Sequence, residues 1–339
     1  MSELRQDRTT GRWTIIAPRR GTRPGGKLET QQRTHGVAHD RASCPFCPGH
    51  EAELPGIVAE TPAPGAPGWS VRVVPNKFPA LQPQATLDTP SSDDHRTRAG
   101  RGIHEVVIES PRHDADLASM TAPERLAVVS MYRQRSRELL AQDGIETVVL
   151  FRNRGARAGA SQDHPHAQIV ALDLVPPRLT ALIETGLRHF QSEGRCATCA
   201  ELDVERRDGR RVVEDSAQFV ALVPFAAEHP FELWIVPKRH RASFTDIDDG
   251  ELGDLGEILG RSLRRLSAAL NDPSYRLVVD SAPKSGIAAP HLHWRLRIVP
   301  ETVAWGGFEL GAEMAINPSR PEDDAAALRA VRAGDDEKA

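Results

Sequence analysis

The four cysteines of this chain form two Cys-x-x-Cys pairs, and two widely spaced histidines follow each pair. Two neighbouring thiolates and two distant imidazoles make the donor set of a closed, tetrahedral zinc site. The sequence therefore predicts two structural Zn²⁺ sites, and free buried thiols or a disulfide within each pair are the alternatives. The predicted ligands are Cys44, Cys47, His113 and His164 in the first site, and Cys196, Cys199, His240 and His291 in the second.

The spacing of the histidines indicates an internal duplication. The separation between His113 and His240 along the chain equals the separation between His164 and His291. A repeat of this length is typical of two similar domains rather than of a solenoid. The predicted division gives an N-terminal half of residues 1–175 and a C-terminal half of residues 176–339.

A loop of small residues precedes His164, and the second half has a different segment, Ser281–Gly286, in its place. It contains Gly159, Ala160 and Ser161. Small residues let backbone amides approach a phosphate closely, and the Ser161 hydroxyl adds a donor. The loop therefore predicts a phosphate-binding site in the first half.

The strand after this loop carries the predicted catalytic groups. Alternation along a strand puts His164, His166 and Gln168 on one face. A neutral imidazole at His166 is able to attack phosphorus and form a phosphoramidate, while the Gln168 amide donates to a phosphate oxygen. A third histidine in place of Gln168 would suit hydrolysis better. In the second half, the equal spacing aligns His293 with His166, and a structural role is expected for it.

The elements that position these groups occur in the same order in both halves. Mostly apolar runs predict strands, and a Thr-x-x-Glu capping pattern predicts the start of the first helix. Each half is expected to form a mainly antiparallel sheet with one packed helix, an α+β fold in which the two sheets can join edge to edge. The expected elements are strands at 104–108, 147–151, 231–235 and 276–279, and helices at 121–144, 180–193 and 245–270.

Composition limits the class of protein. The 339 residues are 39% hydrophobic and 27% charged, enough for two domain-sized cores. A net charge of −4 gives no electrostatic footprint for nucleic acid, and no apolar run approaches membrane length. A cytoplasmic protein is therefore expected, and in that reducing compartment Cys-x-x-Cys pairs more often hold metal than form disulfides.

The His164-Pro165-His166-Ala167-Gln168 motif, together with Cys44, Cys47 and His113, resembles the galactose-1-phosphate uridylyltransferases, the transferase branch of the histidine-triad superfamily. The resemblance covers nearly the whole chain. It implies two histidine-triad-like halves, of which only the first is catalytic. It also implies that His166 becomes uridylylated and that Gln168 and Ser161 hold the transferred phosphoryl group.

The same resemblance implies binding residues and a homodimer in which two arginines reach the partner subunit's site. The nucleotide-binding positions carried over are Asn76, Phe78, Asn153, Gly159 and Ala160. The sugar-phosphate-binding positions are Arg20, Arg23, Phe308, Glu309 and Asn317, of which Arg20 and Arg23 are the arginines that act across the dimer.

The implied reaction is a ping-pong exchange. UDP-glucose would transfer UMP to His166 and release glucose 1-phosphate, and galactose 1-phosphate would then accept the UMP. The segment Gly311–Pro318 and the two Cys-x-x-Cys pairs are equally similar to the ADP-glucose phosphorylase branch, which transfers AMP to phosphate through the same histidine. Uridylyl transfer is the favoured interpretation and ADP-sugar phosphorolysis the alternative. A non-enzymatic, zinc-stapled nucleotide-binding protein and a histidine-triad hydrolase are minor alternatives.

Overall fold

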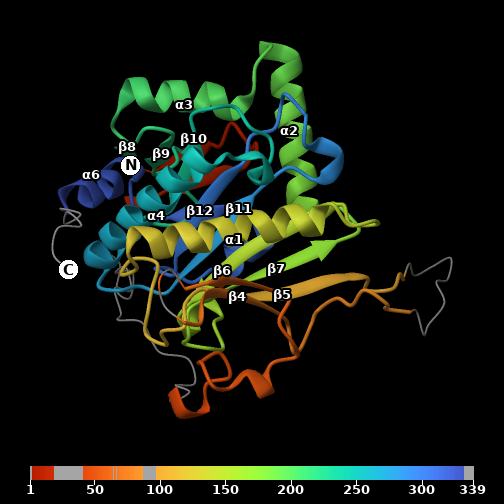
Figure 1. Ribbon diagram of the computed structural model, residues 1–339. Coiled ribbons are helices and arrows are strands. Elements are labelled where there is room, and N and C mark those ends of the chain that lie inside the picture. The colour runs from red at the N-terminus through yellow and green to blue at the C-terminus, as the bar shows by residue number, and fades with distance from the viewer. Residues whose placement is uncertain (1, 19–40, 64, 66, 87–96, 332–339) are drawn as a thin grey trace.

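The computed structural model describes residues 2–18, 41–63, 65, 67–86 and 97–331, so Arg20 and Arg23 lie outside the described residues (Figure 1). The strands are β1 (Glu3–Gln6), β2 (Trp13–Ile16), β3 (Ala59–Pro62), β4 (Trp69–Pro75), β5 (Gly102–Ile108), β6 (Thr147–Arg154), β7 (His166–Leu172), β8 (Val212–Asp215), β9 (Phe219–Leu222), β10 (Leu233–Pro237), β11 (Tyr275–Asp280), β12 (Arg295–Pro300) and β13 (Ala315–Asn317). The helices are α1 (Ala122–Leu140), α2 (Pro177–Glu193), α3 (Ala197–Asp208), α4 (Asp249–Leu270), α5 (Gly307–Ala312) and α6 (Pro321–Ala330).

One antiparallel sheet of ten strands runs through both halves of the chain. Its order is β3-β4-β5-β7-β6-β11-β12-β10-β9-β8. The first five strands come from the N-terminal half and the last five from the C-terminal half, and β6 pairs with β11 at the centre. The predicted α+β fold and the edge-to-edge joining of the two sheets are therefore confirmed. The predicted division at residues 175 and 176 falls between β7 and α2.

Helices α1 and α4 lie side by side across the same face of this sheet (Figure 1). Helix α1 begins with a capping box, in which the Glu124 carboxylate accepts from the backbone N–H of Thr121 at 2.8 Å. Helix α4 begins later than the predicted residue 245, because Asp248 and Glu251 form its capping box and a 3-10 turn at Phe244–Asp246 comes first. Apolar residues of both helices pack on the sheet and form one continuous core.

The contact between α1 and α4 depends on a glycine. Arg125 of α1 is fully buried and its guanidinium bonds to Glu257 of α4 at 3.1 Å. A Cβ atom on Gly260 would lie only 2.6–2.8 Å from the Arg125 guanidinium and the carbon next to it. Since Arg125 has no solvent to move into, the helices could not keep this approach with a larger residue.

We therefore expect Gly260→Ala to destabilise the protein by about 1–3 kcal/mol through overpacking. The matched control is Gly253→Ala in the same helix, because a Cβ atom there meets nothing within 4 Å. That control is expected to gain about 0.5–1 kcal/mol from helix propensity. Thermal unfolding of both variants measures the effect, and equal melting temperatures for the two would contradict this account of the interface.

A second, three-stranded sheet ties the N-terminus to the C-terminal segment. Its order is β1-β2-β13, with β13 parallel to β2. The pairing puts the segment that contains α5 and β13 next to the start of the chain. No helix among the described residues has the length and apolar character needed to cross a membrane.

Candidate active site

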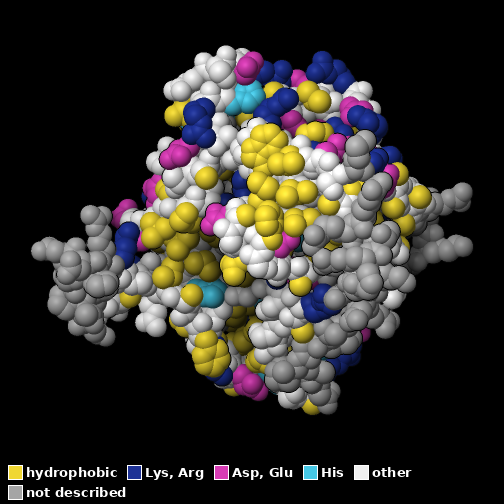
Figure 2. Space-filling view, turned by 180° about the vertical axis from the view of Figure 1, so that it is seen from behind, with side chains coloured by type: hydrophobic (Ala, Val, Ile, Leu, Met, Phe, Trp, Pro, Cys, Tyr) yellow, Lys and Arg dark blue, Asp and Glu magenta, His cyan; other side chains and the backbone are white. Residues whose placement is uncertain are grey.

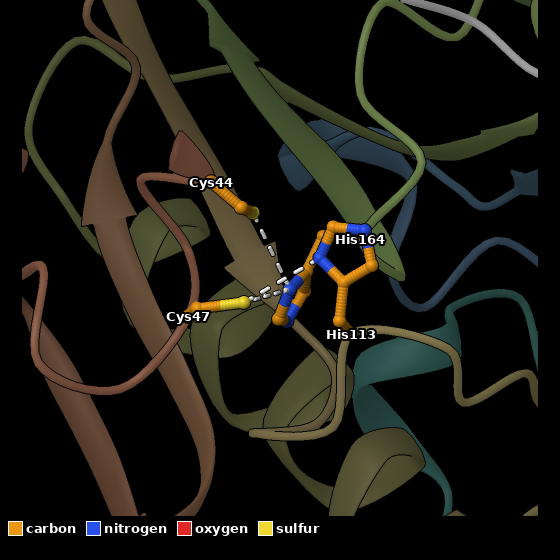
Figure 3. Close-up of side chains that lie close together, drawn as sticks. All are labelled: Cys44, Cys47, His113 and His164. Carbon is orange, nitrogen blue, oxygen red and sulfur yellow. Dashed lines mark hydrogen bonds between the residues drawn. The ribbon is translucent and has the colours of Figure 1, made fainter. Parts of the chain in front are cut away.

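The first predicted ligand set comes together at the end of β7 (Figure 3). Cys44 and Cys47 lie on a turn after residues 41–43, and His113 follows β5. The Nδ1 atom of His164 lies 3.6 Å from both sulfur atoms, and that of His113 lies 3.4 Å from the Cys47 sulfur. All four donor atoms lie within 4.8 Å of one another, so this group could hold a metal ion.

The second group contains His293 rather than the predicted His291. Cys196 caps the start of α3 and Cys199 lies in its first turn. The Cys199 sulfur lies 3.4 Å from Nδ1 of His240 and 3.3 Å from Nδ1 of His293. The donor atoms within 4.8 Å of one another belong to these four residues, and His291 is not among them. The prediction of His291 as a ligand is therefore wrong.

Both groups have the dimensions and donor set of a tetrahedral metal site. Zinc–sulfur and zinc–nitrogen bonds of about 2.3 and 2.0 Å, at a tetrahedral angle, put the two donors about 3.5 Å apart. The second nitrogen, Nε2, donates to the Ser110 carbonyl in His164 and to the Pro237 carbonyl in His293. Such bonds leave Nδ1 free as the ligand atom. All four cysteines are free, so the disulfide alternative is not seen.

The strand register explains the misassigned histidine. Strands β12, β11 and β10 of the second half correspond to β7, β6 and β5 of the first half. In these pairings, Arg297 on β12 occupies the position that Gln168 occupies on β7. Two residues earlier, Arg295 stands where His166 stands. The partners of Gln168 and Arg297 on β6 and β11 are Phe151 and Val278, which also pair with each other. The chain from Val278 to Arg297 is longer than the chain from Phe151 to Gln168, and its two extra residues bring His293, rather than His291, to the position of His164.

In the second half, Arg295 occupies the position that corresponds to His166. Arg295 is 1% exposed, lies over the Trp234 ring at 3.8 Å and pairs with Asp280 at 3.2 Å. A guanidinium held in this way has no lone pair to attack phosphorus. The expected structural role of the second half stays a prediction, and His293 belongs to the second Cys2His2 group instead of matching His166.

In the first half, the local structure fixes the orientation of the His166 ring. The Nδ1–H group of His166 donates to the backbone carbonyl of His164 at 2.8 Å. This bond leaves the lone pair on Nε2, and His166 lines the cavity described below. The Phe46 ring packs against the His166 ring with centroids 5.5 Å apart. The first metal group therefore supports the nucleophile through both the His164 carbonyl and the Cys44–Cys47 turn.

Burial holds the pKa of His166 below its ordinary value of 6.5, and the positive charge of Arg152 lowers it further. The bond to the His164 carbonyl acts in the opposite direction but is outweighed. The neutral, nucleophilic ring therefore persists at pH values where an exposed histidine would be protonated.

The family resemblance implies that His166 becomes nucleotidylated, and we expect the rate of that step to stay constant as the pH falls through 6.5 and to decline only at more acid pH. The sign follows from the lowered pKa, because protonation of Nε2 removes the attacking lone pair. Single-turnover rates from about pH 5 to about pH 8 test this. A half-maximal rate at or above pH 6.5 would contradict it.

A hydrogen-bond network holds Gln168 beside His166. His104 of β5 donates from Nε2 to the Gln168 side-chain oxygen at 2.8 Å. The Asn76 amide nitrogen lies 3.4 Å from the same oxygen, and the Asn76 oxygen accepts from the backbone N–H of Phe78 at 2.8 Å. His104 was not predicted from the sequence, since it is a single histidine in a strand with no partner at a recognisable spacing.

These residues line a cavity of about 500 Å³. Its apolar wall includes Phe46 and Leu54 from the first Cys-x-x-Cys turn and the segment after it. Phe78 is 84% exposed at the cavity, so its ring is available to stack on a base. Lys77 is the only Lys or Arg among the described residues that line the cavity.

One predicted residue of the loop before His164 lines the cavity, and the other two make hydrogen bonds within the loop. Ser161 lines the cavity. The N–H groups of Gly159 and Ala160 donate within the loop, to carbonyls at residues 156 and 155. Gly159 has a φ of +89°, which favours glycine, and a Cβ atom there would lie 3.5 Å from the Asn153 amide nitrogen. The cavity lining does not include Asn153, Gly159 or Ala160.

Beneath the site lies a buried ion pair. Arg152 of β6 bonds to both oxygens of Glu109 at 2.9–3.0 Å, and Tyr132 also donates to Glu109. Burial raises the pKa of Glu109, while Arg152 opposes the rise. The backbone of Glu109 donates to the Pro165 carbonyl at 3.0 Å, which ties this network to the strand end that carries His166.

The predicted sugar-phosphate residues in the described part of the chain lie outside this cavity. Phe308 is exposed on α5, and the Glu309 carboxylate accepts from the backbone N–H of Gly306, which caps the same helix. Asn317 is 0% exposed, and its amide donates to the Ala227 carbonyl at 3.0 Å. A fully buried Asn317 cannot reach a ligand, so the structure gives it a structural role in place of the predicted one.

The chain is similar to known proteins along its whole length. Residues 1–176 match the family model described as the N-terminal domain of galactose-1-phosphate uridyl transferase, and residues 206–296 match the HIT domain. An ADP-glucose phosphorylase from Arabidopsis thaliana is 36% identical over 97% of this chain and 93% of its own length. A galactose-1-phosphate uridylyltransferase from Thermotoga maritima is 27% identical over 97% and 98%.

A solved structure shares the fold. The crystal structure of an ADP-glucose phosphorylase from Arabidopsis thaliana with bound ADP-glucose superposes with a TM-score of 0.83, at 35% identity, over 98% of this chain and 99% of that one. The enzymes matched are of the nucleotidyltransferase type. Because the family model covers more than half of the sequence and these relatives span almost all of it, the chain belongs to the galactose-1-phosphate uridylyltransferase family.

Proposed function

We propose that this protein is a nucleotidyltransferase that takes AMP from ADP-glucose or a related ADP-sugar onto His166 and passes it to inorganic phosphate. The geometry that supports the covalent step is the tautomer of His166, whose Nδ1–H is held by a carbonyl and whose Nε2 lone pair is free beside the cavity. The single observation behind the choice of AMP is the 36% identity to an ADP-glucose phosphorylase over nearly the whole of both chains.

The proposed reaction has two displacements. In the first, Nε2 of His166 attacks the α-phosphorus of the ADP-sugar, the bond from that phosphorus to the bridging oxygen breaks, and sugar 1-phosphate leaves with the electron pair. In the second, a phosphate oxygen attacks the same phosphorus, the P–N bond breaks, and ADP leaves while His166 regains its lone pair. The Gln168 amide and the Ser161 hydroxyl donate to the phosphoryl oxygens, which carry the negative charge in both steps.

Uridylyl transfer between UDP-glucose and galactose 1-phosphate is the second candidate. The family model and the Thermotoga maritima relative favour it, and so does the motif around His166. The chemistry at His166 would be the same, with UMP in place of AMP and a hexose 1-phosphate in place of phosphate. The relatives named as uridylyltransferases are less similar, at 27–30% identity, which is why ADP-sugar phosphorolysis is preferred.

The proposed active enzyme is a homodimer. Two phosphate-bearing substrates need cations, yet Lys77 is the only Lys or Arg among the described residues that line the cavity. Arg20 and Arg23 from a second copy would supply the missing charges. Exposed apolar side chains that could pack in such an interface include Trp305, Phe308 and Leu310. Figure 2 shows that apolar side chains gather in groups on the face turned away from α1 and α4.

The proposed metal is zinc at both Cys2His2 groups, in a structural role. Thiolate and imidazole donors favour zinc, and each group has four protein donor atoms, the number found in closed structural zinc sites. The bound ion would fix the Cys44–Cys47 turn and the His164 strand end. In this proposal the substrate contacts protein side chains and not the metal ion.

The test compares two complete reactions on one preparation: ADP-glucose with phosphate, and UDP-glucose with galactose 1-phosphate. Products are separated by anion-exchange chromatography, and each donor is also offered the other acceptor. We expect kcat/KM for ADP-glucose with phosphate to exceed that for UDP-glucose with galactose 1-phosphate by about 100-fold or more, a difference of about 2.7 kcal/mol.

The opposite ratio would assign the protein as a uridylyltransferase and overturn the proposed donor. Turnover of neither donor with any acceptor would overturn nucleotidyl transfer itself. If phosphate accepted the nucleotidyl group from both donors at similar rates, the proposed selectivity for adenine would be wrong, although the enzyme would still be a phosphorylase.

A further inference from the structure

His104 lies between two parts of the site that must act together. One is Gln168, the proposed hydrogen-bond donor to the phosphoryl group, and the other is the loop that carries Phe78. It is half-buried on β5 and lines the cavity. Its backbone carbonyl accepts from the Asn76 N–H at 2.8 Å, and its ring contacts Gln168 on the neighbouring strand β7. The two displacement steps proposed above assign no role to this side chain.

The hydrogen bonds of the ring define its tautomer. The backbone N–H of Ala80 donates to Nδ1 of His104 at 3.1 Å. A backbone amide can only donate, so Nδ1 carries the lone pair and the neutral ring carries its proton on Nε2. That proton points to the Gln168 side-chain oxygen, 2.8 Å away.

The orientation of the Gln168 amide follows from this tautomer. The His104 N–H lies 2.8 Å from the Gln168 oxygen, and the Asn76 amide nitrogen, which lies 3.1 Å from Nε2 of His104, is 3.4 Å from the same oxygen. The oxygen is therefore held toward β5, and the amide nitrogen of Gln168 is left as the group available to a substrate. A flip of the amide would put two donors against each other and would present an oxygen lone pair to an anionic phosphate.

The geometry points to His104 as a positioning residue for nucleotidyl transfer: it holds the Gln168 amide with its donor toward the phosphoryl group. The inference rests on the proposed nucleotidyl transfer and adds to it a residue that acts through Gln168 without contacting the reacting atoms. Ala80 lies at the end of the loop that begins at Asn76 and carries Phe78. Because Ala80 donates to the His104 ring, this ring also links that loop to Gln168.

Two substitutions separate the donor from the rest of the ring. His104→Gln places an amide nitrogen near the position of Nε2 and keeps a donor for Gln168. His104→Asn reaches only as far as Nδ1 and loses that donor. We expect His104→Asn to slow single-turnover nucleotidylation of His166 by about 10-fold to 100-fold, while His104→Gln stays within about threefold of the wild type.

A double-mutant cycle with Gln168→Ala tests whether His104 acts through Gln168. In the Gln168→Ala background, His104→Asn should slow the step by less than about twofold, because there is no amide left to orient. Donor binding, measured by the Kd of the nucleotide sugar, should change less than the rate. Melting temperature and zinc content of each variant show whether it is folded.

The experiment measures nucleotidylation of His166 by intact-protein mass spectrometry after rapid mixing with ADP-glucose or UDP-glucose. Additive effects of His104→Asn and Gln168→Ala, equal losses in His104→Asn and His104→Gln, or a wild-type rate in folded His104→Asn would each overturn the role of His104. No adduct on the wild type with either donor would instead overturn the proposed function, and the inference with it.

Discussion

Replacing His166 with asparagine is expected to abolish turnover while leaving the fold and donor binding in place. The asparagine amide nitrogen can take the place of Nδ1 and keep the bond to the His164 carbonyl, which is 2.8 Å long in the wild type. Only Nε2 is then lost. Since Nε2 is the atom that attacks phosphorus, kcat should fall by a factor on the order of 10⁴–10⁶.

The measurement is steady-state turnover of ADP-glucose and phosphate, and of UDP-glucose and galactose 1-phosphate, beside the Kd for each donor. Melting temperature should stay close to that of the wild type, because His166 makes a single side-chain hydrogen bond among the described residues. A folded variant that keeps more than about 1% of wild-type kcat would mean that phosphate or sugar phosphate attacks the donor directly, and the covalent mechanism would be wrong.

The second large effect is expected from the first metal group. Cys44→Ala should remove one zinc ion per chain and slow nucleotidylation of His166 by about 10-fold to 100-fold or more. The reason is structural, because His164 is both a member of this group and the residue whose carbonyl orients His166. The ring of Phe46, between the two cysteines, also packs against His166.

Cys196→Ala is the matched control, since Cys196 is also the buried first cysteine of its pair. It should likewise lose one zinc ion and lower the melting temperature, but the adduct should form within about threefold of the wild-type rate. Among the described residues, neither group itself lines the cavity, but Cys44 and Cys47 enclose Pro45 and Phe46, which do, whereas no cavity-lining residue adjoins a member of the second group. Zinc content by mass spectrometry and single-turnover rates test both variants. Loss of His166 nucleotidylation in a folded Cys196→Ala protein would contradict the account that only the first metal group supports the reaction.

The first half of the site could be predicted because its signals are local. The Cys-x-x-Cys pair, His113 and the His-x-His-x-Gln strand each have a spacing that indicates a role, and the structure brings the metal set and the cavity residues together. Helix α1 could also be predicted, from its Thr121 and Glu124 capping box. Such features depend on a few neighbouring residues and on strand alternation.

The errors arose where the answer depended on pairing between distant segments. The equal spacing of the histidines in the two halves indicated His291, but the register of β12 against β10 and β11 brings His293 into the second Cys2His2 group. His104 gave no signal, because its partners come from β7 and from the loop after β4. Asn317 is a polar residue in a segment that resembles the family's sugar-facing motif, yet tertiary packing buries it completely.

Intact-protein mass spectrometry of the wild-type enzyme, mixed briefly with one donor and no acceptor, tests the central claim most directly. ADP-glucose is expected to leave an adduct of one AMP per chain, absent from His166→Asn and removed when phosphate is added. A UMP adduct from UDP-glucose alone would keep the histidine intermediate but contradict the proposed donor. The absence of any adduct with both donors, in a preparation that turns over, would contradict a nucleotidyl-His166 intermediate.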